Sequence, residues 1–368
     1  MKFSCEGLDL ADAVLKVVKA AAVRTTNPIL ECVKIVAEDD KLTLTCTDLE
    51  LTITKIIKAD IKMEGTAVIP AKFFAEFASK ISGERLDFNL KDNKIMEVKY
   101  SDNTAVFQCQ MANEFPAPHI LEEPNFVEIR SDLFKDLVTK ASVAVAQDDS
   151  RPMLRGILLE VEKNELRGVS LDGVRMALIK KPTEAHSAEF GIIVPARCLL
   201  EIVRLLPDSN EVIKVCTQKN HLEINLGDTI LMTRLLGMKS DYVSYNQILP
   251  NDFGTVINVN KQHLLDTIDR ASLLARAERN YVVKFNIANN QMVINSESQL
   301  GNITEHLQVT ESGADLVIEF NGRLYTDALR VIPDEFVKIS YVNSTSPCVI
   351  TATEGNDFLY LVLPMRPM

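Results

Sequence analysis

The stretch Ala67-Val-Ile-Pro-Ala-Lys-Phe-Phe-Ala-Glu-Phe77 decides the fold, because a version of it occurs three times in the chain. The other copies are Val194-Pro-Ala-Arg-Cys-Leu199 and Phe320-Asn-Gly-Arg-Leu-Tyr325, with the basic residue in register at offsets of 125 and 126 residues. In each copy a β-branched run ends at Pro or Asn-Gly, and an amphipathic segment with helical spacing follows. A period this long indicates three copies of a whole domain.

Two further landmarks repeat with one offset. Pro28-Ile-Leu30 recurs as Pro152-Met-Leu154 and Asp48 recurs as Asp172, both 124 residues later. A chain of 368 residues is long enough for two or three cores. We therefore predict three similar domains with an α+β fold, each with two helices packed on antiparallel sheets. The predicted domains are residues 1–125, 126–252 and 253–368.

Hydrophobic periodicity predicts the elements of each domain. The predicted helices are Leu8 to Val23, Lys72 to Lys80, Asp132 to Ala146, Ala196 to Leu206 and Lys261 to Ala277. The predicted strands include Ile29 to Val36, Lys41 to Thr47, Leu51 to Ile57, Leu86 to Leu90, Ile95 to Tyr100, Thr104 to Met111, Phe126 to Ile129, Thr255 to Val259, Val282 to Ile287, Gln291 to Asn295 and Phe358 to Leu363.

Composition is that of an ordinary globular protein, with 46% apolar and 25% charged residues. No apolar run approaches the ~20 residues that span a bilayer, and the start Met1-Lys-Phe-Ser-Cys-Glu-Gly7 is not a cleavable signal. We expect a cytoplasmic protein that contacts no membrane. The seven cysteines are scattered and never spaced Cys-x-x-Cys, which favours reduced core thiols over disulfides or a zinc site. No metal and no cofactor is expected.

The net charge of −11 argues against a simple basic nucleic-acid binder, but the basic residues concentrate on the predicted helices. Arg197 and Arg204 are seven residues apart and share a helix face, as do Arg323 and Arg330. Much of the acidic excess falls in strands and turns. Such a protein could follow a phosphate backbone with one basic surface, or these residues could be ordinary solvated helix faces.

No catalytic motif is present: the chain has no phosphate-binding loop, no nucleophile elbow and no His-Glu-x-x-His pair. Asp48 and Asp172 could form a carboxylate pair, but their repetition with the domain favours a turn-forming role. Cys198 has no base nearby in sequence, which disfavours a nucleophile. We predict no catalytic residue.

Two stretches have the composition of a binding site. Ser170 to Leu178 interrupts a strand pattern with an Asp-Gly turn, and Leu361-Val-Leu-Pro-Met-Arg366 places apolar side chains and a rigid Pro near the chain end. Adaptable Met and Leu side chains around a few polar groups suit a groove for short peptides. The alternative is that both are ordinary core strands.

Several short motifs along the chain match one known family. They are Met1-Lys-Phe3, Arg24 to Leu30, Thr47-Asp-Leu-Glu50, Phe115-Pro116, Asp172-Gly173 with Arg175, and Tyr360 to Arg366. Through them the chain resembles, over its full length, the bacterial sliding clamp, the β subunit of DNA polymerase III. The resemblance implies a head-to-tail homodimer that closes into a ring, with helices lining a hole through which double-stranded DNA passes without sequence readout. It also implies partners: the replicative polymerase α subunit, the clamp loader and other proteins with a clamp-binding motif.

The resemblance assigns residues to three surfaces. The partner-peptide pocket would contain Leu154, Leu171, Gly173, Val174, Arg175, Met176, Ser240, Gln247, Ile248, Leu361, Leu363, Pro364 and Met365. The DNA-facing residues would be Arg24, Lys72, Lys80, Arg151, Arg197, Arg204 and Arg323. The dimer interface would include Phe107, Leu273 and Leu274.

The chain departs from the family pattern around this pocket. Val174 stands where the family commonly has His, and Ser240 where it commonly has Pro. Val243-Ser-Tyr-Asn246 lengthens the following loop, and Pro367 and Met368 extend the usual ending. These positions bear on peptide preference. Two rival functions stay open at this point: a monomeric three-domain peptide-binding scaffold, and an enzyme that uses Asp48, Asp172 or Cys198.

Overall fold

The computed structural model describes residues 1–92, 94–117, 126–183, 189–277 and 281–365. The chain divides into two compact units. Unit 1 comprises Met1–Ser131 and Glu201–Leu235, and unit 2 comprises Asp132–Leu200 and Leu236–Met368. Within the described ranges, no helix is long and apolar enough to cross a membrane.

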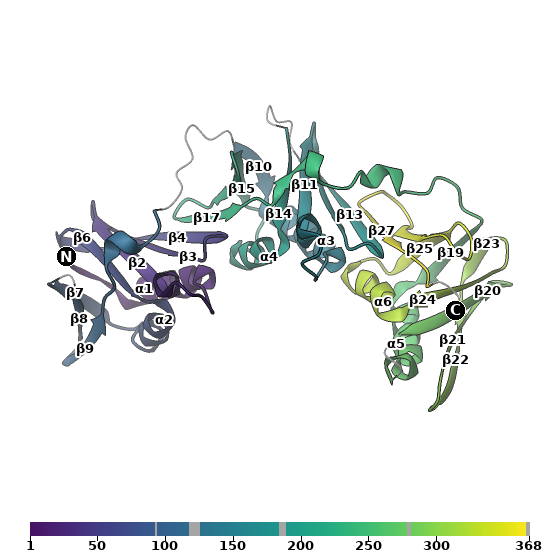
Figure 1. The fold of residues 1–368 in the computed structure, drawn as a ribbon, viewed down its shortest axis with the longest axis horizontal. Coiled ribbons are helices and arrows are strands. Elements are labelled where there is room, and N and C mark those ends of the chain that lie inside the picture. Colours follow the sequence, from purple (N-terminus) through teal and green to yellow (C-terminus); the bar gives the residue numbers. More distant parts are fainter. Residues whose placement is uncertain (93, 118–125, 184–188, 278–280, 366–368) are drawn as a thin grey trace. The chain divides into compact units, whose positions relative to one another are not determined.

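Unit 1 contains two antiparallel sheets (Figure 1). The five-stranded sheet has the order β5-β1-β7-β8-β9, and the eight-stranded sheet has the order β10-β15-β16-β17-β4-β3-β2-β6. Their strands are β1 (Lys2–Glu6), β2 (Cys32–Glu38), β3 (Lys41–Thr47), β4 (Leu51–Lys58), β5 (Asp60–Met63), β6 (Gly65–Pro70), β7 (Arg85–Lys91), β8 (Ile95–Tyr100), β9 (Asn103–Gln108), β10 (Phe126–Arg130), β15 (Val212–Gln218), β16 (His221–Asn225) and β17 (Thr229–Arg234).

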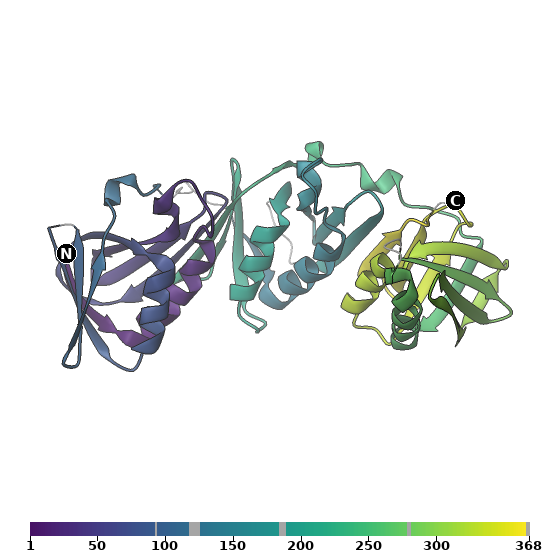
Figure 2. The ribbon, with the colours of Figure 1, turned by 60° about the horizontal axis from the view of Figure 1, so that its bottom comes forward.

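Helices α1 (Gly7–Val17) and α2 (Ala71–Lys80) of unit 1 lie side by side, as the purple and blue helices of Figure 2 show. Leu10, Val14 and Val17 are fully buried, on the face that the spacing predicts. The start of α1 packs closely on the turn that follows α2, where the Gly7 N–H donates to the Glu84 carbonyl at 2.8 Å. The pair therefore forms one tightly packed helical layer on its sheets.

Unit 2 also contains two antiparallel sheets, a ten-stranded one ordered β18-β14-β11-β12-β13-β27-β26-β25-β19-β23 and a four-stranded one ordered β22-β21-β20-β24. Helices α5 (Lys261–Ala277) and α6 (Gly322–Val331) pack against each other and on the four-stranded sheet (Figure 1). The strands are β11 (Gly156–Glu162), β12 (Glu165–Leu171), β13 (Arg175–Pro182), β14 (Phe190–Pro195), β18 (Gly237–Met238), β19 (Thr255–Asn260), β20 (Val282–Ala288), β21 (Gln291–Ser298), β22 (Gly301–Gln308), β23 (Thr310–Gly313), β24 (Leu316–Asn321), β25 (Phe336–Tyr341), β26 (Cys348–Ala352) and β27 (Phe358–Val362).

The repeated stretch is a strand-to-helix junction in all three copies. β6 ends at Pro70, β14 at Pro195 and β24 at Asn321, and α2, α4 (Ala196–Leu205) and α6 begin at the next residue. The third copy replaces Pro by a capping residue, because the Asn321 Oδ1 accepts hydrogen bonds from the N–H groups of Arg323 and Leu324. The predicted break between strand and helix is therefore confirmed in each copy.

Predicted element bounds are confirmed for β3, β8 and α5, and several others are wrong by a few residues. Ile29 and Leu30 lie in a 3₁₀ turn (Pro28–Glu31) and not in a strand, because Pro28 has the fixed φ that suits the first position of a helical turn. The helix predicted to run to Ala146 is α3 (Ser131–Ala141), followed by a 3₁₀ turn. Likewise α1 ends at Val17, and a 3₁₀ turn follows.

Two strand pairs join segments assigned to different sequence domains. Within unit 1, β4 pairs antiparallel with β17, and within unit 2, β13 pairs with β27. Each pairing makes one continuous sheet from two repeats, so backbone hydrogen bonds hold the repeats together there. The domain boundaries at 125/126 and 252/253 stay predictions.

We predict that Gly7→Ala destabilises the protein by about 2 kcal/mol, because the new methyl group would lie 2.5 Å from the Glu84 carbonyl oxygen and 2.7 Å from that of Ile81. Urea unfolding followed by circular dichroism measures the loss as a lower midpoint. Gly83→Ala is the matched control, since no described atom lies within 4 Å of its added methyl group. Equal midpoints for both variants would contradict the close packing of α1.

Candidate functional site

The two stretches with binding-site composition lie side by side in unit 2. Pairing of β13 with β27 places Met176 opposite Leu361. Beyond the last pair, the Leu363 N–H donates to the Val174 carbonyl at 2.9 Å, and the Met365 N–H donates to the Glu319 carbonyl at 2.8 Å. The end of the described chain is thus fixed against the Asp-Gly turn.

Apolar side chains from four segments of the chain gather at this place. Leu154, Leu171, Met176 and Leu361 are buried in one cluster with Tyr242 and Tyr245 from the loop after β18. Above this floor, Val174 is 45% exposed, Ile248 40% and Leu363 37%. Gly173, Ser240 and Gln247 are also exposed, and Pro364 and Met365 are half-buried. The thirteen residues predicted for the pocket therefore divide into a buried floor, a partly apolar exposed rim and Arg175.

The turn that carries Gly173 and Val174 is held by Asp172. Its Oδ1 accepts hydrogen bonds from the N–H groups of Val174 and Arg175, both at 3.0 Å, and Gly173 has a left-handed φ of 96°. Asp48 forms the same turn in unit 1, accepting from Glu50 and Leu51 at 3.0 and 2.8 Å. The turn-forming interpretation of both aspartates is confirmed.

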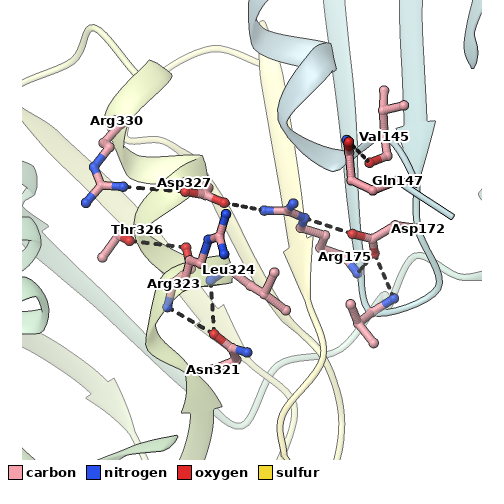
Figure 3. Close-up of polar contacts among 11 residues, drawn as sticks. Val145, Gln147, Asp172, Arg175, Asn321, Arg323, Leu324, Thr326, Asp327 and Arg330 are labelled. Carbon is pink, nitrogen blue, oxygen red and sulfur yellow. Dashed lines mark hydrogen bonds and ion pairs between the residues drawn. The ribbon is translucent and has the colours of Figure 1, made fainter. Parts of the chain in front are cut away.

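Arg175 connects this turn to helix α6 (Figure 3). Its Nε donates to Asp172 at 2.9 Å and its Nη1 to Asp327 at 2.8 Å, and the Arg175 side chain is only 13% exposed. Asp327 also pairs with Arg330, which binds both oxygens of Asp269 on α5 at 2.9 and 3.1 Å. The guanidinium of Arg175 therefore positions the rim through ion pairs inside the protein.

A buried carboxylate that the sequence reasoning missed anchors the loop of Ser240, Gln247 and Ile248. Glu160 on β11 is completely buried, accepts a hydrogen bond from Tyr245 Oη at 2.6 Å and forms an ion pair with Lys239 Nζ at 2.6 Å. Burial, together with the hydrogen bond to Glu160, raises the pKa of Tyr245 to about 12. A single Glu inside the apolar run Gly156-Ile-Leu-Leu-Glu-Val161 was the available signal.

All seven residues predicted to face DNA are exposed. In the part of the chain that the structure describes, Arg24, Lys72, Lys80, Arg151 and Arg323 form no ion pair. Arg204 pairs with Glu201. Lys140, which the charge pattern grouped with the helical basic residues, is instead 6% exposed and bound to Asp136 at 2.7 Å.

The predicted dimer residues differ in accessibility. Phe107 is only 4% exposed, because it packs on Phe74 and Phe77 with ring centroids 5.4 and 5.0 Å apart. The exposed apolar side chains beside it are Phe73, 63% exposed, and Val106, 57% exposed. On α5, Leu273 is 59% exposed and Leu274 is half-buried.

The described residues offer no catalytic or metal centre. Among them, no group of three or more His, Cys, Asp or Glu side chains could hold a metal ion. All seven cysteines are free thiols in the structure, and six of them are buried, which confirms that they lie in the core. Cys198 is fully buried in α4, so its thiol is inaccessible to a substrate. Burial also raises the pKa of Cys5 to about 12, which keeps that thiol protonated.

Helices on antiparallel sheets, exposed basic residues on those helices and a partly exposed apolar cluster where two repeats join are the features of a clamp-type scaffold. Three family models match it, and together they cover nearly all of the chain. They describe the DNA polymerase III beta subunit N-terminal domain (residues 1–119), its central domain (128–239) and its C-terminal domain (246–366). The chain belongs to the DNA polymerase III beta subunit family, the non-catalytic sliding clamps of DNA replication.

Individual relatives are similar to this chain over their full length. The chain is 28% identical to the beta sliding clamp of Bacillus subtilis, with both chains covered completely. The crystal structure of the Bacillus subtilis DNA polymerase sliding clamp superimposes with a TM-score of 0.96 at 28% identity, covering 100% of each chain. That of a putative DNA polymerase III beta subunit from Eubacterium rectale gives 0.95 at 30% identity, again over 100% of each chain.

We predict that Tyr245→Phe destabilises unit 2 by about 1–2 kcal/mol, because buried Glu160 loses a hydrogen-bond donor while the ring packing stays. Thermal unfolding followed by circular dichroism would register it as a lower midpoint. The control is Tyr100→Phe, since the Tyr100 hydroxyl makes no hydrogen bond to another described residue. If the two variants unfold at the same temperature, Glu160 does not anchor the loop.

Proposed function

We propose that two copies of this chain close into a ring around duplex DNA and tether the replicative polymerase through the groove at the β13–β27 junction. Full-length membership in the beta subunit family carries the proposal. The polymerase supplies the chemistry, and the clamp itself makes and breaks no bond. The domain boundaries given above and a cytoplasmic location belong to the same proposal.

Electrostatics supports contact with DNA through the helices. Lys72 and Lys80 on α2, Arg197 and Arg204 on α4 and Arg323 on α6 are exposed, although the whole chain carries a charge of −11. Phosphate attraction from such residues is not sequence-specific and weakens with salt, so it permits movement along the duplex. Retention on DNA then comes from enclosure and does not require high affinity.

Exposed sheet edges support ring closure. β9 is an edge of the five-stranded sheet and β22, eight residues long, is an edge of the four-stranded sheet. Unpaired edge strands present free backbone donors and acceptors that can pair with another chain. Phe73 and Val106 near β9, and Leu273 on α5, add apolar surface for the partner. We propose that β9 of one chain joins β22 of its partner, with the Phe107 cluster behind the contact.

The groove supports peptide binding by several partners. Its apolar floor and exposed Val174, Ile248 and Leu363 suit a short segment with apolar side chains. The partners proposed are the polymerase α subunit, the clamp loader and other proteins with a clamp-binding motif. The loader must be a separate ATPase, because this sequence has no nucleotide-binding motif. Tethering raises the effective concentration of the polymerase at the primer end.

The decisive experiment loads the protein, with its loader, on nicked circular DNA and then linearises the circle. Enclosure predicts that nearly all of the bound protein leaves through the free ends, whereas blocked ends retain it. Gel filtration of labelled protein with DNA measures both fractions. Retention on linear DNA with open ends would refute the topological mechanism.

We predict that Met365→Ala weakens binding of the polymerase peptide by about tenfold, because it removes half-buried apolar surface from the groove. Fluorescence anisotropy with a labelled peptide measures the affinity, and sedimentation should show an unchanged dimer. Met111→Ala, which removes a Met that is 60% exposed in unit 1, is the control. Loss of the dimer together with binding would invalidate the groove assignment.

Deletion of residues 361–368 does not test peptide binding as specifically as Met365→Ala does. Leu361 and Val362 are 2% and 1% exposed in the core strand β27, so the deletion would also unfold the sheet.

A further inference from the structure

The β4–β17 junction of unit 1 repeats the backbone frame of the peptide groove. In the groove, the Leu363 N–H donates to the Val174 carbonyl at 2.9 Å; in unit 1, the Arg234 N–H donates to the Glu50 carbonyl at 2.9 Å. The Asp48 and Asp172 turns are also equivalent in hydrogen bonding. Equivalent backbone atoms are therefore hydrogen-bonded at both junctions.

The segment that supplies the floor is equivalent as well. The Leu154 N–H donates to Arg151 at 3.0 Å, and the Leu154 carbonyl accepts from Ala146 at 2.9 Å. In unit 1, the Leu30 N–H donates to Asn27 at 3.1 Å, and the Leu30 carbonyl accepts from Ala22 at 2.9 Å. The backbone hydrogen bonds of Leu30 and Leu154, of Arg234 and Leu363, and of the Asp48 and Asp172 turns are therefore equivalent in the two repeats.

A cavity of about 180 Å³ occupies this place in unit 1. Its walls are more polar than those of the groove, because Thr47 and Thr52 stand where the groove has Leu171 and Met176. The two threonine hydroxyls are hydrogen-bonded to each other at 2.8 Å. Arg234 takes the place of Leu363, and Met232 that of Leu361. We call this cavity the second groove, and the proposed peptide groove at the β13–β27 junction the first groove.

Leu49 on the rim of the second groove has an unusual backbone. It has a left-handed φ of 74° at the position where the first groove has Gly173, and it is 58% exposed. A large side chain in this conformation is strained, and strained residues concentrate at functional sites. The hydrogen-bonded Asp48 turn therefore places an apolar side chain at the mouth of the cavity.

The charge at the second groove indicates its ligand. Arg234 is exposed and, among the described residues, forms no ion pair. A guanidinium next to hydroxyl groups suits a carboxylate, which it can bind through two N–H groups. Because Glu50 shares the rim, one carboxylate is favoured over an acidic run.

We propose that the second groove binds an extended peptide segment that carries a single Asp or Glu beside a Leu. The carboxylate binds Arg234, and the Leu contacts Leu49 and Met232. The choice of a peptide as occupant rests on the proposed function of the first groove. This chain would then offer two peptide sites of different chemistry on one repeated frame.

The test uses the full-length protein and the fluorescein-labelled hexapeptide Gly-Ser-Leu-Asp-Ser-Gly, with an Asn version as the matched ligand. Anisotropy should show saturable binding of the Asp peptide and about tenfold weaker binding of the Asn peptide. Arg234→Gln should lower the affinity for the Asp peptide by a similar factor. Lys58→Gln, which removes an exposed positive charge of unit 1 outside the second groove, should leave its affinity unchanged.

The location is tested by photocrosslinking the same peptide with benzoylphenylalanine in place of the first Ser. Crosslinks within residues 45–52 and 232–234 would support the second groove. Crosslinks within residues 171–176 and 361–365 would overturn the proposed location. The absence of binding at peptide concentrations up to about 1 mM would overturn the proposal as a whole. If the second groove binds no peptide, the proposed function still stands when a polymerase peptide binds the first groove and Met365→Ala weakens that binding.

Discussion

The rest of the structure depends on two antiparallel strand pairs, β4 with β17 and β13 with β27, which carry each sheet from one repeat into the next. Backbone hydrogen bonds at these junctions are independent of side-chain identity, so the same frame can carry different side chains. At one junction the frame carries Leu, Met and Val, and at the other Thr, Glu and Arg. The ladder thus fixes the backbone geometry at both junctions, and the side chains that it carries differ in polarity.

The junctions also explain why the groove can be rigid although part of it lies near the chain end. Leu363 and Met365 are each held by a backbone hydrogen bond, and Arg175 connects the opposite rim to α6 through Asp172 and Asp327. A rim fixed in advance loses less conformational entropy on binding. Buried Glu160 has the same effect on the loop that contains Tyr245.

Much of this could be predicted from the sequence, because the strongest signals were local or periodic. Pro70, Pro195 and Asn321 end strands for reasons intrinsic to each residue, and the Asp48 and Asp172 turns follow from one side chain and its neighbours. The burial of single side chains was harder to predict, because it depends on segments that come together only in the fold. Lys140 is 6% exposed and pairs with Asp136, which also binds Lys181 of β13, and Phe107 is 4% exposed because it packs on the Phe74 and Phe77 rings of α2. No helical periodicity contains that information.

The proposed ring around DNA consists of two copies of this chain joined at two interfaces. Sedimentation equilibrium at micromolar concentrations therefore tests the central claim most directly. The account predicts a mass near twice the 41.0 kDa of one chain, reduced when Val106 and Leu273 are replaced by Glu. A mass of one chain that persists as concentration rises would contradict it and leave a monomeric peptide-binding scaffold.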